Sequence, residues 1–214
     1  MTNFLLAGGG TAGHVNPLLA LADAIRSDST SHRIFALGTV EGLEQQLVPQ
    51  RGYELLTVAR LPFPRKLNSY ALKFPAAFSK AIAECFKILQ DNKIDVVVGF
   101  GGYASAPAYL AARKLGIPVV VHEANALPGW ANKLGSRFAA ATGVAFRGTA
   151  LKNATFVGMP LRKEIEALST NSDPAAARRY FGLDPKTITL LVTGGSLGAK
   201  KINQTIDESR DRKS

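Results

Sequence analysis

The sequence predicts a doubly wound α/β fold built on a parallel sheet, and two observations indicate it. Short apolar runs rich in valine, isoleucine and phenylalanine alternate along the chain with stretches of helical length and period. Several runs, such as residues 96–98 and 119–121, are apolar without interruption, which is typical of strands covered by helices on both faces. A strand followed by a helix and then by another strand indicates a crossover, so we expect the strands to be parallel.

The expected elements follow one another in a regular order. The predicted strands are residues 3–7, 33–38, 54–58, 94–99, 117–121, 142–146 and 154–157. The predicted helices between them are residues 17–26, 41–50, 104–115 and 127–139. A β-rich run at residues 187–192, a glycine-rich loop and a helical segment at residues 200–206 then repeat the opening of the chain. We therefore expect two Rossmann-like halves: a complete N-terminal domain over residues 1–162, then a linker and the first strand and helix of a second domain over residues 163–214.

Composition limits the classes of function. Lys and Arg number 26 against 16 Asp and Glu, a formal charge of +10 that favours an anionic partner such as a membrane surface or a phosphorylated substrate, although solubility alone is an alternative. No helix-turn-helix, zinc-finger or RNA-binding motif is present, so we expect no nucleic-acid partner. A single Cys excludes a disulfide framework and favours a reducing cytoplasm. With no signal peptide and no apolar run of roughly 20 residues, we expect a soluble or peripheral protein.

A glycine-rich loop follows the first predicted strand. Gly8, Gly10 and Gly13 fit the pattern G-x-G-x-x-G between a strand and a helix, where glycines let backbone amides approach a diphosphate at a helix N-terminus. A dinucleotide-binding dehydrogenase has the same loop, but it also has an acidic residue at the end of the second strand, and here residues 35–39 read Phe-Ala-Leu-Gly-Thr. The dehydrogenase is therefore the weaker alternative.

Polar residues follow several strands at the edge where ligands of such sheets bind. His14 comes directly after the first glycine loop, and Asn16 and Pro17 are expected to be the N-cap and first residue of the next helix. The imidazole would then act as a base or a phosphate partner, or simply bond the start of the helix. Residues 122–125 (His-Glu-Ala-Asn) and the glycine-rich residues 99–107 end two further strands, so we expect these groups to converge.

These motifs, in this order, resemble the MurG family of N-acetylglucosaminyl transferases. The matching stretches are residues 8–14, 99–105, 115–125, 158–162, 194–199 and 203–205. The resemblance implies a GT-B fold of two Rossmann-like domains, with the acceptor bound by the N-terminal domain and most of the UDP-sugar bound by the C-terminal one. It implies an inverting transfer of N-acetylglucosamine from UDP-N-acetylglucosamine to undecaprenyl-pyrophosphoryl-N-acetylmuramyl-pentapeptide (lipid I to lipid II), without a metal or other cofactor, with other cell-wall synthesis proteins as candidate partners.

The resemblance also assigns roles to individual residues. His14 falls on the family's essential histidine and is the candidate catalytic base, helped by Glu123. The expected donor-binding residues are Thr11, Ala12, Gly13, Asn125, Arg162 and Ser196. The residues expected near the acceptor diphosphate are Gly8, Gly9, Gly10, Gly101, Gly102 and Tyr103. The chain departs from the family at Met159, where many relatives have Asn, and in lacking the rest of the donor domain. We therefore expect no turnover from these 214 residues, and a non-catalytic lipid- or partner-binding protein and another nucleotide-sugar enzyme are alternatives.

A basic and aromatic segment indicates a membrane surface. Residues 60–83 contain five basic residues and no acidic one, interleaved with leucines and aromatic residues. Such a segment suits an anionic lipid surface, where each Lys or Arg contributes about 1 kcal/mol. The predicted patch consists of Arg65, Lys66, Lys73, Phe74, Phe78 and Lys80. The alternative is a helix that packs its apolar side on the core. With a polyprenyl substrate, the first interpretation places the protein peripherally at the cytoplasmic face of a bacterial membrane.

Overall fold

The computed structural model describes residues 1–64, 66–170, 172–194 and 199–210. The chain divides into two compact units, Met1–Lys163 and Glu164–Ser214, and each is described by itself. The division falls one residue from the expected domain boundary.

The first unit is built on a parallel sheet. Within its described residues the sheet has seven strands in the order β3-β2-β1-β4-β5-β6-β7, and every neighbouring pair is parallel. The strands are β1 Asn3–Ala7, β2 Arg33–Thr39, β3 Glu54–Val58, β4 Val96–Gly99, β5 Val119–Glu123, β6 Ala141–Val144 and β7 Ala154–Phe156. The seven strands predicted for this unit and their parallel direction are confirmed. The strand order reverses between β1 and β4, which is the point where open α/β sheets bind ligands.

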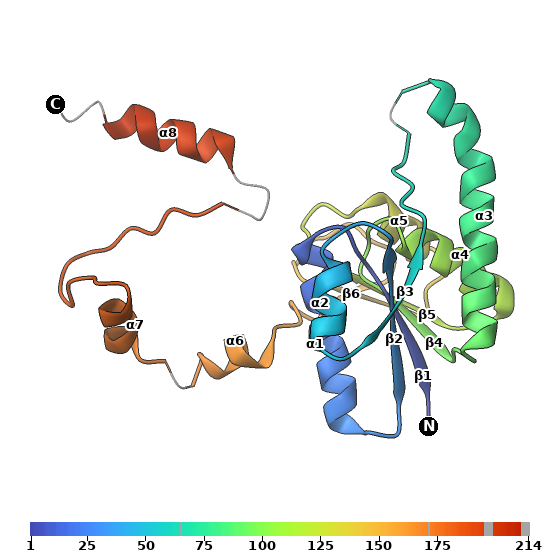
Figure 1. The fold of residues 1–214 in the computed structure, drawn as a ribbon, viewed down its shortest axis with the longest axis horizontal. Helices are drawn as coiled ribbons and strands as arrows, with labels where there is room; N and C mark the ends of the chain where they lie inside the picture. Colours follow the sequence, from blue (N-terminus) through green and yellow to red (C-terminus); the bar gives the residue numbers. More distant parts are fainter. Residues whose placement is uncertain (65, 171, 195–198, 211–214) are drawn as a thin grey trace. The chain divides into compact units, whose positions relative to one another are not determined.

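Helices cover the sheet on two sides. They are α1 Ala12–Asp28, α2 Glu44–Gln50, α3 Ser69–Asp91, α4 Ser105–Leu115 and α5 Trp130–Gly135. Figure 1 shows α1 and α2 on one side of the sheet and α3 and α4 on the other. Successive residues of a strand face opposite sides of the sheet, as β1 shows. Leu5 and Ala7 belong to the apolar cluster shared with α3 and α4, whereas Leu6 belongs to the cluster shared with α1. Each fully buried leucine of this kind stabilises the fold by about 1.5–3 kcal/mol.

The start of α1 differs from the prediction. The helix begins at Ala12 with Thr11 as N-cap, so Asn16 is not the cap and Pro17 lies inside the helix. The reason is packing. Val15 is already fully buried, so contact with the core begins before the proline. Pro17 has no N–H to bond the carbonyl of the residue four positions earlier, and the helix continues through that single missing bond.

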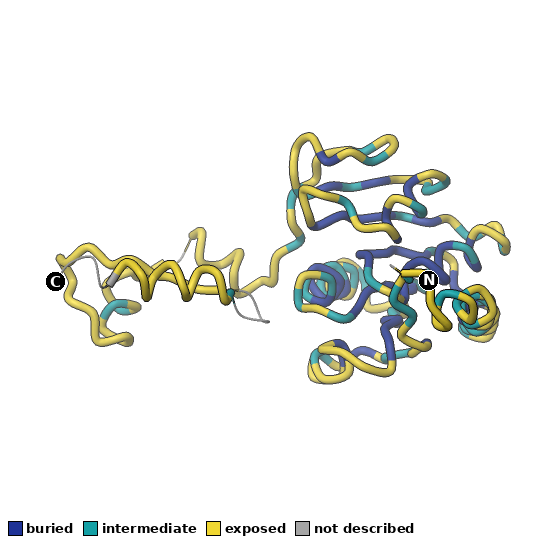
Figure 2. The backbone as a smooth tube through the Cα atoms, turned by 90° about the horizontal axis from the view of Figure 1, so that it is seen from above, coloured by how far each residue is buried: buried dark blue, intermediate teal, exposed yellow. Residues whose placement is uncertain are grey.

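Among its described residues, the second unit contains three short helices. They are α6 Lys163–Ala167, which begins at the unit boundary, α7 Pro174–Tyr180 and α8 Lys200–Arg210. The helix predicted at residues 200–206 is confirmed, but the strand predicted at residues 187–192 is not present. Ile188 is 97% exposed and Leu190 is 82% exposed. A strand needs a hydrogen-bonded neighbour, and no strand is present among the described residues of this unit. In Figure 2 the unit is almost entirely exposed.

Candidate functional site

Three loops meet at the carboxyl ends of three adjacent strands. Residues 8–11 follow β1, residues 100–104 follow β4 and residues 124–129 follow β5. The first two loops are in close backbone contact, because a Cβ atom added at Gly102 would lie 2.6 Å from the carbonyl oxygen of Gly9. Gly101 and Gly102 also have φ values of +88° and +83°, a conformation that favours glycine. The first two loops are therefore in contact, and the third follows the neighbouring strand β5 at the same edge of the sheet.

The first glycine loop uses part of its own hydrogen-bonding capacity. The Gly8 amide donates to the Leu37 carbonyl at 3.0 Å, and the Gly10 amide donates to Glu44 Oε2 at 2.8 Å. Gly8 and Gly10 therefore shape the loop, and their N–H groups are not available to a diphosphate. In contrast, the amides of Ala12 and Gly13 in the first turn of α1 have no acceptor among the described residues. N–H groups without an acceptor at a helix N-terminus are suited to bond an anion.

Sequence reasoning missed Glu44, which lies under the first glycine loop. Its side chain is fully buried, and Oε1 accepts from the amide and the hydroxyl of Thr39 at 2.9 and 2.8 Å. Cβ atoms added at Gly9, Gly38 or Gly42 would overlap this side chain. Burial opposes ionisation, but the hydrogen bonds from Thr39 and Gly10 outweigh it, so the pKa of Glu44 is lowered. The glycines at positions 38 and 42 were the sequence signal for this buried carboxylate.

His14 lies between the first and second glycine loops. Its Nδ1 is 3.1 Å from the carbonyl oxygen of Gly9 and 3.3 Å from the Thr11 hydroxyl. Because a carbonyl oxygen only accepts, the bond to Gly9 requires a proton on Nδ1 and leaves the lone pair on Nε2. A Cβ atom added at Gly101 would lie 3.3 Å from that Nε2 atom. The lone pair of this tautomer is therefore next to the second glycine loop.

Glu123 holds the loop that follows β5. Its side chain is 1% exposed. Oε1 accepts from the Asn125 amide and side chain at 2.9 and 2.8 Å, and Oε2 accepts from the Gly129 amide and from Asn132 Nδ2, both at 3.0 Å. With three bonds to this loop and one to α5, the carboxylate is placed to position the exposed Asn125. This geometry favours positioning over the proton transfer expected from the sequence.

A buried hydrogen-bond network also holds the start of that loop in place. The Tyr109 hydroxyl on α4 donates to Asn132 Oδ1 on α5 at 2.8 Å, and Asn132 Nδ2 also donates to the His122 carbonyl at 3.1 Å. Burial raises the pKa of Tyr109, so the phenol remains a donor. Cβ atoms added at Gly99 or Gly135 would overlap the Tyr109 side chain, so both positions need glycine.

The other predicted site residues lie in different surroundings. Tyr103 is 36% exposed, and the Arg60 guanidinium lies 5.5 Å from the centre of its ring. Arg162 is exposed at the end of the first unit, beyond β7. Ser196 and Arg65 lie outside the described residues. Within the described residues, no group of three or more His, Cys, Asp or Glu side chains is placed to hold a metal ion.

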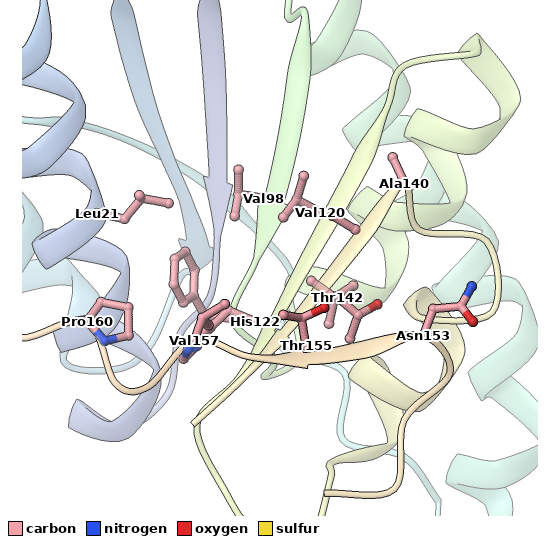
Figure 3. A pocket seen from close by; sticks show the side chains of 14 residues that line it. Leu21, Val98, Val120, His122, Ala140, Thr142, Asn153, Thr155, Val157 and Pro160 are labelled. Carbon is pink, nitrogen blue, oxygen red and sulfur yellow. The ribbon is translucent and has the colours of Figure 1, made fainter. Parts of the chain in front are cut away.

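A cavity of about 450 Å³ lies on the part of the sheet that α1 and α2 leave uncovered. Figure 3 shows Val98, Val120, Thr142 and Thr155 on the strands of its floor. Of the residues in the predicted site segments, His122 and Phe100 line it, whereas His14, Glu123 and Asn125 do not. The cavity borders the second glycine loop at Phe100 but is not lined by His14 or by residues 8–11.

The predicted patch lies mainly on the first half of α3. The buried residues of this helix, Ala81, Cys85 and Leu89, all belong to its second half. The first half extends beyond the sheet in Figure 1. Lys66 precedes the helix, and it is exposed together with Lys73 and Lys80 on the helix. The second half of α3 therefore packs on the core, whereas none of the residues of its first half is buried.

Aromatic side chains from three segments meet on this half of α3. The Phe74 ring lies 5.4 Å from that of Phe78 and 5.6 Å from that of Phe63, and Trp130 lies 4.9 Å from Phe63. Phe63 and Trp130 are 50% and 43% exposed. Along the described part of the chain, none of the helices has the length and apolar character needed to span a bilayer.

The chain is similar to glycosyltransferases along nearly its whole length. Residues 4–144 match the glycosyltransferase family 28 N-terminal domain. A Clavibacter sepedonicus protein named UDP-N-acetylglucosamine--N-acetylmuramyl-(pentapeptide) pyrophosphoryl-undecaprenol N-acetylglucosamine transferase is 58% identical over 99% of this chain and 58% of its own length. The Streptomyces coelicolor protein of the same name is 50% identical over 95% of this chain and 56% of its own length.

Solved structures agree with this. The crystal structure of Acinetobacter baumannii MurG has a TM-score of 0.71 and 31% identity, and the match covers 95% of this chain and 55% of that one. The chain thus spans a little over half the length of these relatives. The matches also remove the dehydrogenase alternative. The chain belongs to glycosyltransferase family 28, whose N-terminal domain it contains, and the resemblance to the MurG family indicated by its motifs is confirmed.

Proposed function

We propose that this chain forms the acceptor-binding part of an inverting transferase. The reaction moves N-acetylglucosamine from UDP-N-acetylglucosamine to undecaprenyl-pyrophosphoryl-N-acetylmuramyl-pentapeptide. The names of the relatives support this substrate pair. The observation that carries the proposal is the position of His14, whose Nε2 lies beside the second glycine loop and whose helix begins with two amides that have no acceptor among the described residues.

In the proposed step, the C4 hydroxyl of the acceptor sugar attacks the anomeric carbon of the donor sugar. The new bond joins that oxygen to the anomeric carbon, the bond from this carbon to the UDP oxygen breaks, and UDP leaves with the electron pair. His14 Nε2 takes the hydroxyl proton, and attack from the face opposite UDP inverts the anomeric centre. Glu123, predicted to help His14, is buried and accepts four hydrogen bonds. We therefore assign it the role of positioning Asn125 near the UDP-sugar.

The N-terminus of α1 suits a diphosphate. The amides of Ala12 and Gly13 and the helix dipole act on the same point, and both favour negative charge. The Gly101 and Gly102 backbone lies across from this turn and forms the other side of the proposed acceptor site. The amides predicted to stabilise the departing UDP, around Ser196, lie outside the described residues.

A proline substitution tests the anion site directly. Thr11 is extended, with φ −135° and ψ 158°, which is the conformation preferred before proline, and Ala12 is the first helical residue, where proline is favoured. Ala12→Pro therefore removes one N–H group that has no acceptor among the described residues while keeping the helix. A hydrogen bond to a charged group contributes about 1.5–3 kcal/mol, so we expect binding of a diphosphate ligand to weaken at least tenfold.

The ligand for this test is a soluble acceptor analogue, N-acetylmuramyl-pentapeptide diphosphate on a short prenyl chain. Binding is measured by calorimetry and by the amide chemical shifts of Gly13 and Gly101. Ser69→Pro is the matched control. Ser69 also begins a helix after an extended N-cap, Asn68, and it lies outside the three loops. Equal affinity for the Ala12→Pro and Ser69→Pro proteins, or no amide shift in the unsubstituted chain, would contradict the proposal.

We further propose that the protein lies peripherally on the cytoplasmic face of the membrane, with the first half of α3 in contact with anionic lipid. Three exposed lysines and a cluster of aromatic rings support this, and Leu72 on the same half is 84% exposed. Co-sedimentation with phosphatidylglycerol vesicles measures it. Leu72→Glu should reduce the bound fraction severalfold, whereas Leu190→Glu, an equally exposed leucine (82%) of the second unit, should not. Binding that neither anionic lipid nor salt affects would refute the contact.

A further inference from the structure

One peptide group connects a buried carboxylate to the imidazole of His14. Glu44 Oε2 accepts from the N–H of Gly10 at 2.8 Å. The carbonyl of Gly9, which belongs to the same peptide group, lies 3.1 Å from His14 Nδ1. We propose that Glu44 is a positioning residue for His14: acting through this peptide group, it keeps the proton on Nδ1 and the lone pair on Nε2. The inference rests on the proposed role of His14 as the base.

The physical basis is that Glu44, at the N–H end of the Gly9–Gly10 amide, and His14, at its carbonyl end, polarise that amide in the same direction. A charge-assisted bond to the N–H group shifts electron density towards the carbonyl oxygen of the same amide, which then becomes a stronger acceptor. Thr11 provides the competing arrangement, because its hydroxyl lies 3.3 Å from His14 Nδ1 and can donate to that atom when the ring proton is on Nε2. Strengthening the Gly9 carbonyl as an acceptor favours the tautomer that a general base needs.

The surroundings of Glu44 hold the carboxylate in place for this task. Its side chain has no exposed surface, and two bonds from Thr39 hold Oε1 while Oε2 bonds Gly10. Burying a carboxylate is costly unless donors compensate for its lost hydration. Three positions that contact it, Gly9, Gly38 and Gly42, lack the Cβ atom that would overlap it. The fold therefore provides a space of the right size for an ionised side chain under the loop that bonds His14.

The test uses the ring nitrogens of His14, because a carboxylate that only supported the loop would leave their protonation unchanged. In the ¹⁵N-labelled chain, two-bond proton–nitrogen correlations distinguish a proton on Nδ1 from one on Nε2. We expect Nδ1 to carry the proton in the unsubstituted protein. Glu44→Gln keeps the length of the side chain, removes its charge and replaces one acceptor with a donor, so the ratio of the Nδ1–H to the Nε2–H tautomer should fall at least threefold.

Two control variants distinguish the effect of Glu44 through the Gly9–Gly10 peptide group from a general effect of its charge and from its support of the loop. Glu54→Gln removes one negative charge at an exposed position of β3 and should leave the tautomer unchanged. Thr39→Val removes the hydroxyl bond to Oε1 but keeps the bond from Oε2 to Gly10, so it should lower stability without altering the ratio. Where Glu44→Gln fails to fold, Glu44→Asp withdraws the carboxylate from Gly10 by one carbon and should lower the ratio as well.

The outcomes are distinct. A His14 proton on Nε2 in the unsubstituted chain overturns the proposed role of Glu44. So does a tautomer ratio that Glu44→Gln and Glu44→Asp leave unchanged. If the ratio changes as expected but the Gly13 and Gly101 amides do not respond to the acceptor analogue, the role of Glu44 is supported. That result would count against the proposed function instead.

Discussion

Replacing Gly102 with alanine should force the two glycine loops apart. Gly102 has a φ value of +83°, and a Cβ atom there would lie 2.6 Å from the Gly9 oxygen and 3.1 Å from the Gly9 nitrogen. Carbon–oxygen contacts are ordinarily no closer than about 3.3 Å, so the backbone of one loop must move by about 0.7 Å. If the Gly9 carbonyl moves, its 3.1 Å contact with His14 Nδ1 changes.

The expected cost has two parts. A residue with a Cβ atom in the left-handed region costs about 1–2 kcal/mol. Forcing an atom into a space that is already filled costs about 1–3 kcal/mol more, so Gly102→Ala should lower the free energy of unfolding by about 2–5 kcal/mol. Gly116→Ala isolates the first part, because Gly116 has a φ value of +71° and a Cβ atom there would meet nothing within 4 Å. Its cost should be about 1–2 kcal/mol.

Urea unfolding followed by circular dichroism measures both variants, and the amide spectrum of Gly9 and Gly10 reports the position of the loop. We expect Gly102→Ala to be the less stable by at least about 1 kcal/mol and to shift both glycine amides. Equal unfolding free energies for the two variants, with unchanged Gly9 and Gly10 amides, would refute the close contact between the loops.

Three further predictions concern buried groups. Burial raises the pKa of the Cys85 thiol to about 12, so it should resist alkylation at about pH 8 until the protein unfolds; mass spectrometry with and without urea checks this, and rapid labelling of the folded chain would contradict it. The lowered pKa of Glu44 means that its ionisation stabilises the fold above the ordinary value of 4.5 and that this stability is lost as the pH falls through the folded-state pKa. Unfolding curves should therefore show Glu44→Gln as destabilising near pH 7 and the difference shrinking as the pH falls below the folded-state pKa, and a difference independent of pH would argue against it. Tyr109→Phe removes the bond to Asn132 and should lower the unfolding free energy by about 1 kcal/mol and speed hydrogen exchange at the Gly129 amide, whereas unchanged exchange there would show that the network does not brace the loop.

The order of elements in the first unit could be predicted because it depends on local pattern. Uninterrupted apolar runs such as residues 119–121 predict strands that are covered on both faces, and strands of this kind are paired in the sheet at the predicted positions. α1 begins at Ala12, five residues before the position that Pro17 predicts from the preference of proline for the first helical position. Burial of Val15 against the core decided otherwise.

The strand at residues 187–192 shows the limit of local pattern. The run is β-rich and apolar, yet Ile188 is almost fully exposed and no strand forms there. Propensity describes how well a residue fits a pleated surface, and it cannot provide the neighbouring strand that the hydrogen bonds require. The expected pattern was present in the sequence, but its partner was not among the described residues.

The sequence by itself determined the fold class, the family and the loops that form the site, because strand periodicity and glycine spacing are local properties. Only the tertiary structure decided how the groups within those loops are used. It showed that Glu44 bonds the Gly10 amide, that Glu123 bonds Asn125, and that the amides of Ala12 and Gly13 have no acceptor among the described residues. The physical reason is that a hydrogen bond depends on the distance between groups such as Gly10 and Glu44, which lie 34 positions apart in the chain, and no local pattern contains that distance.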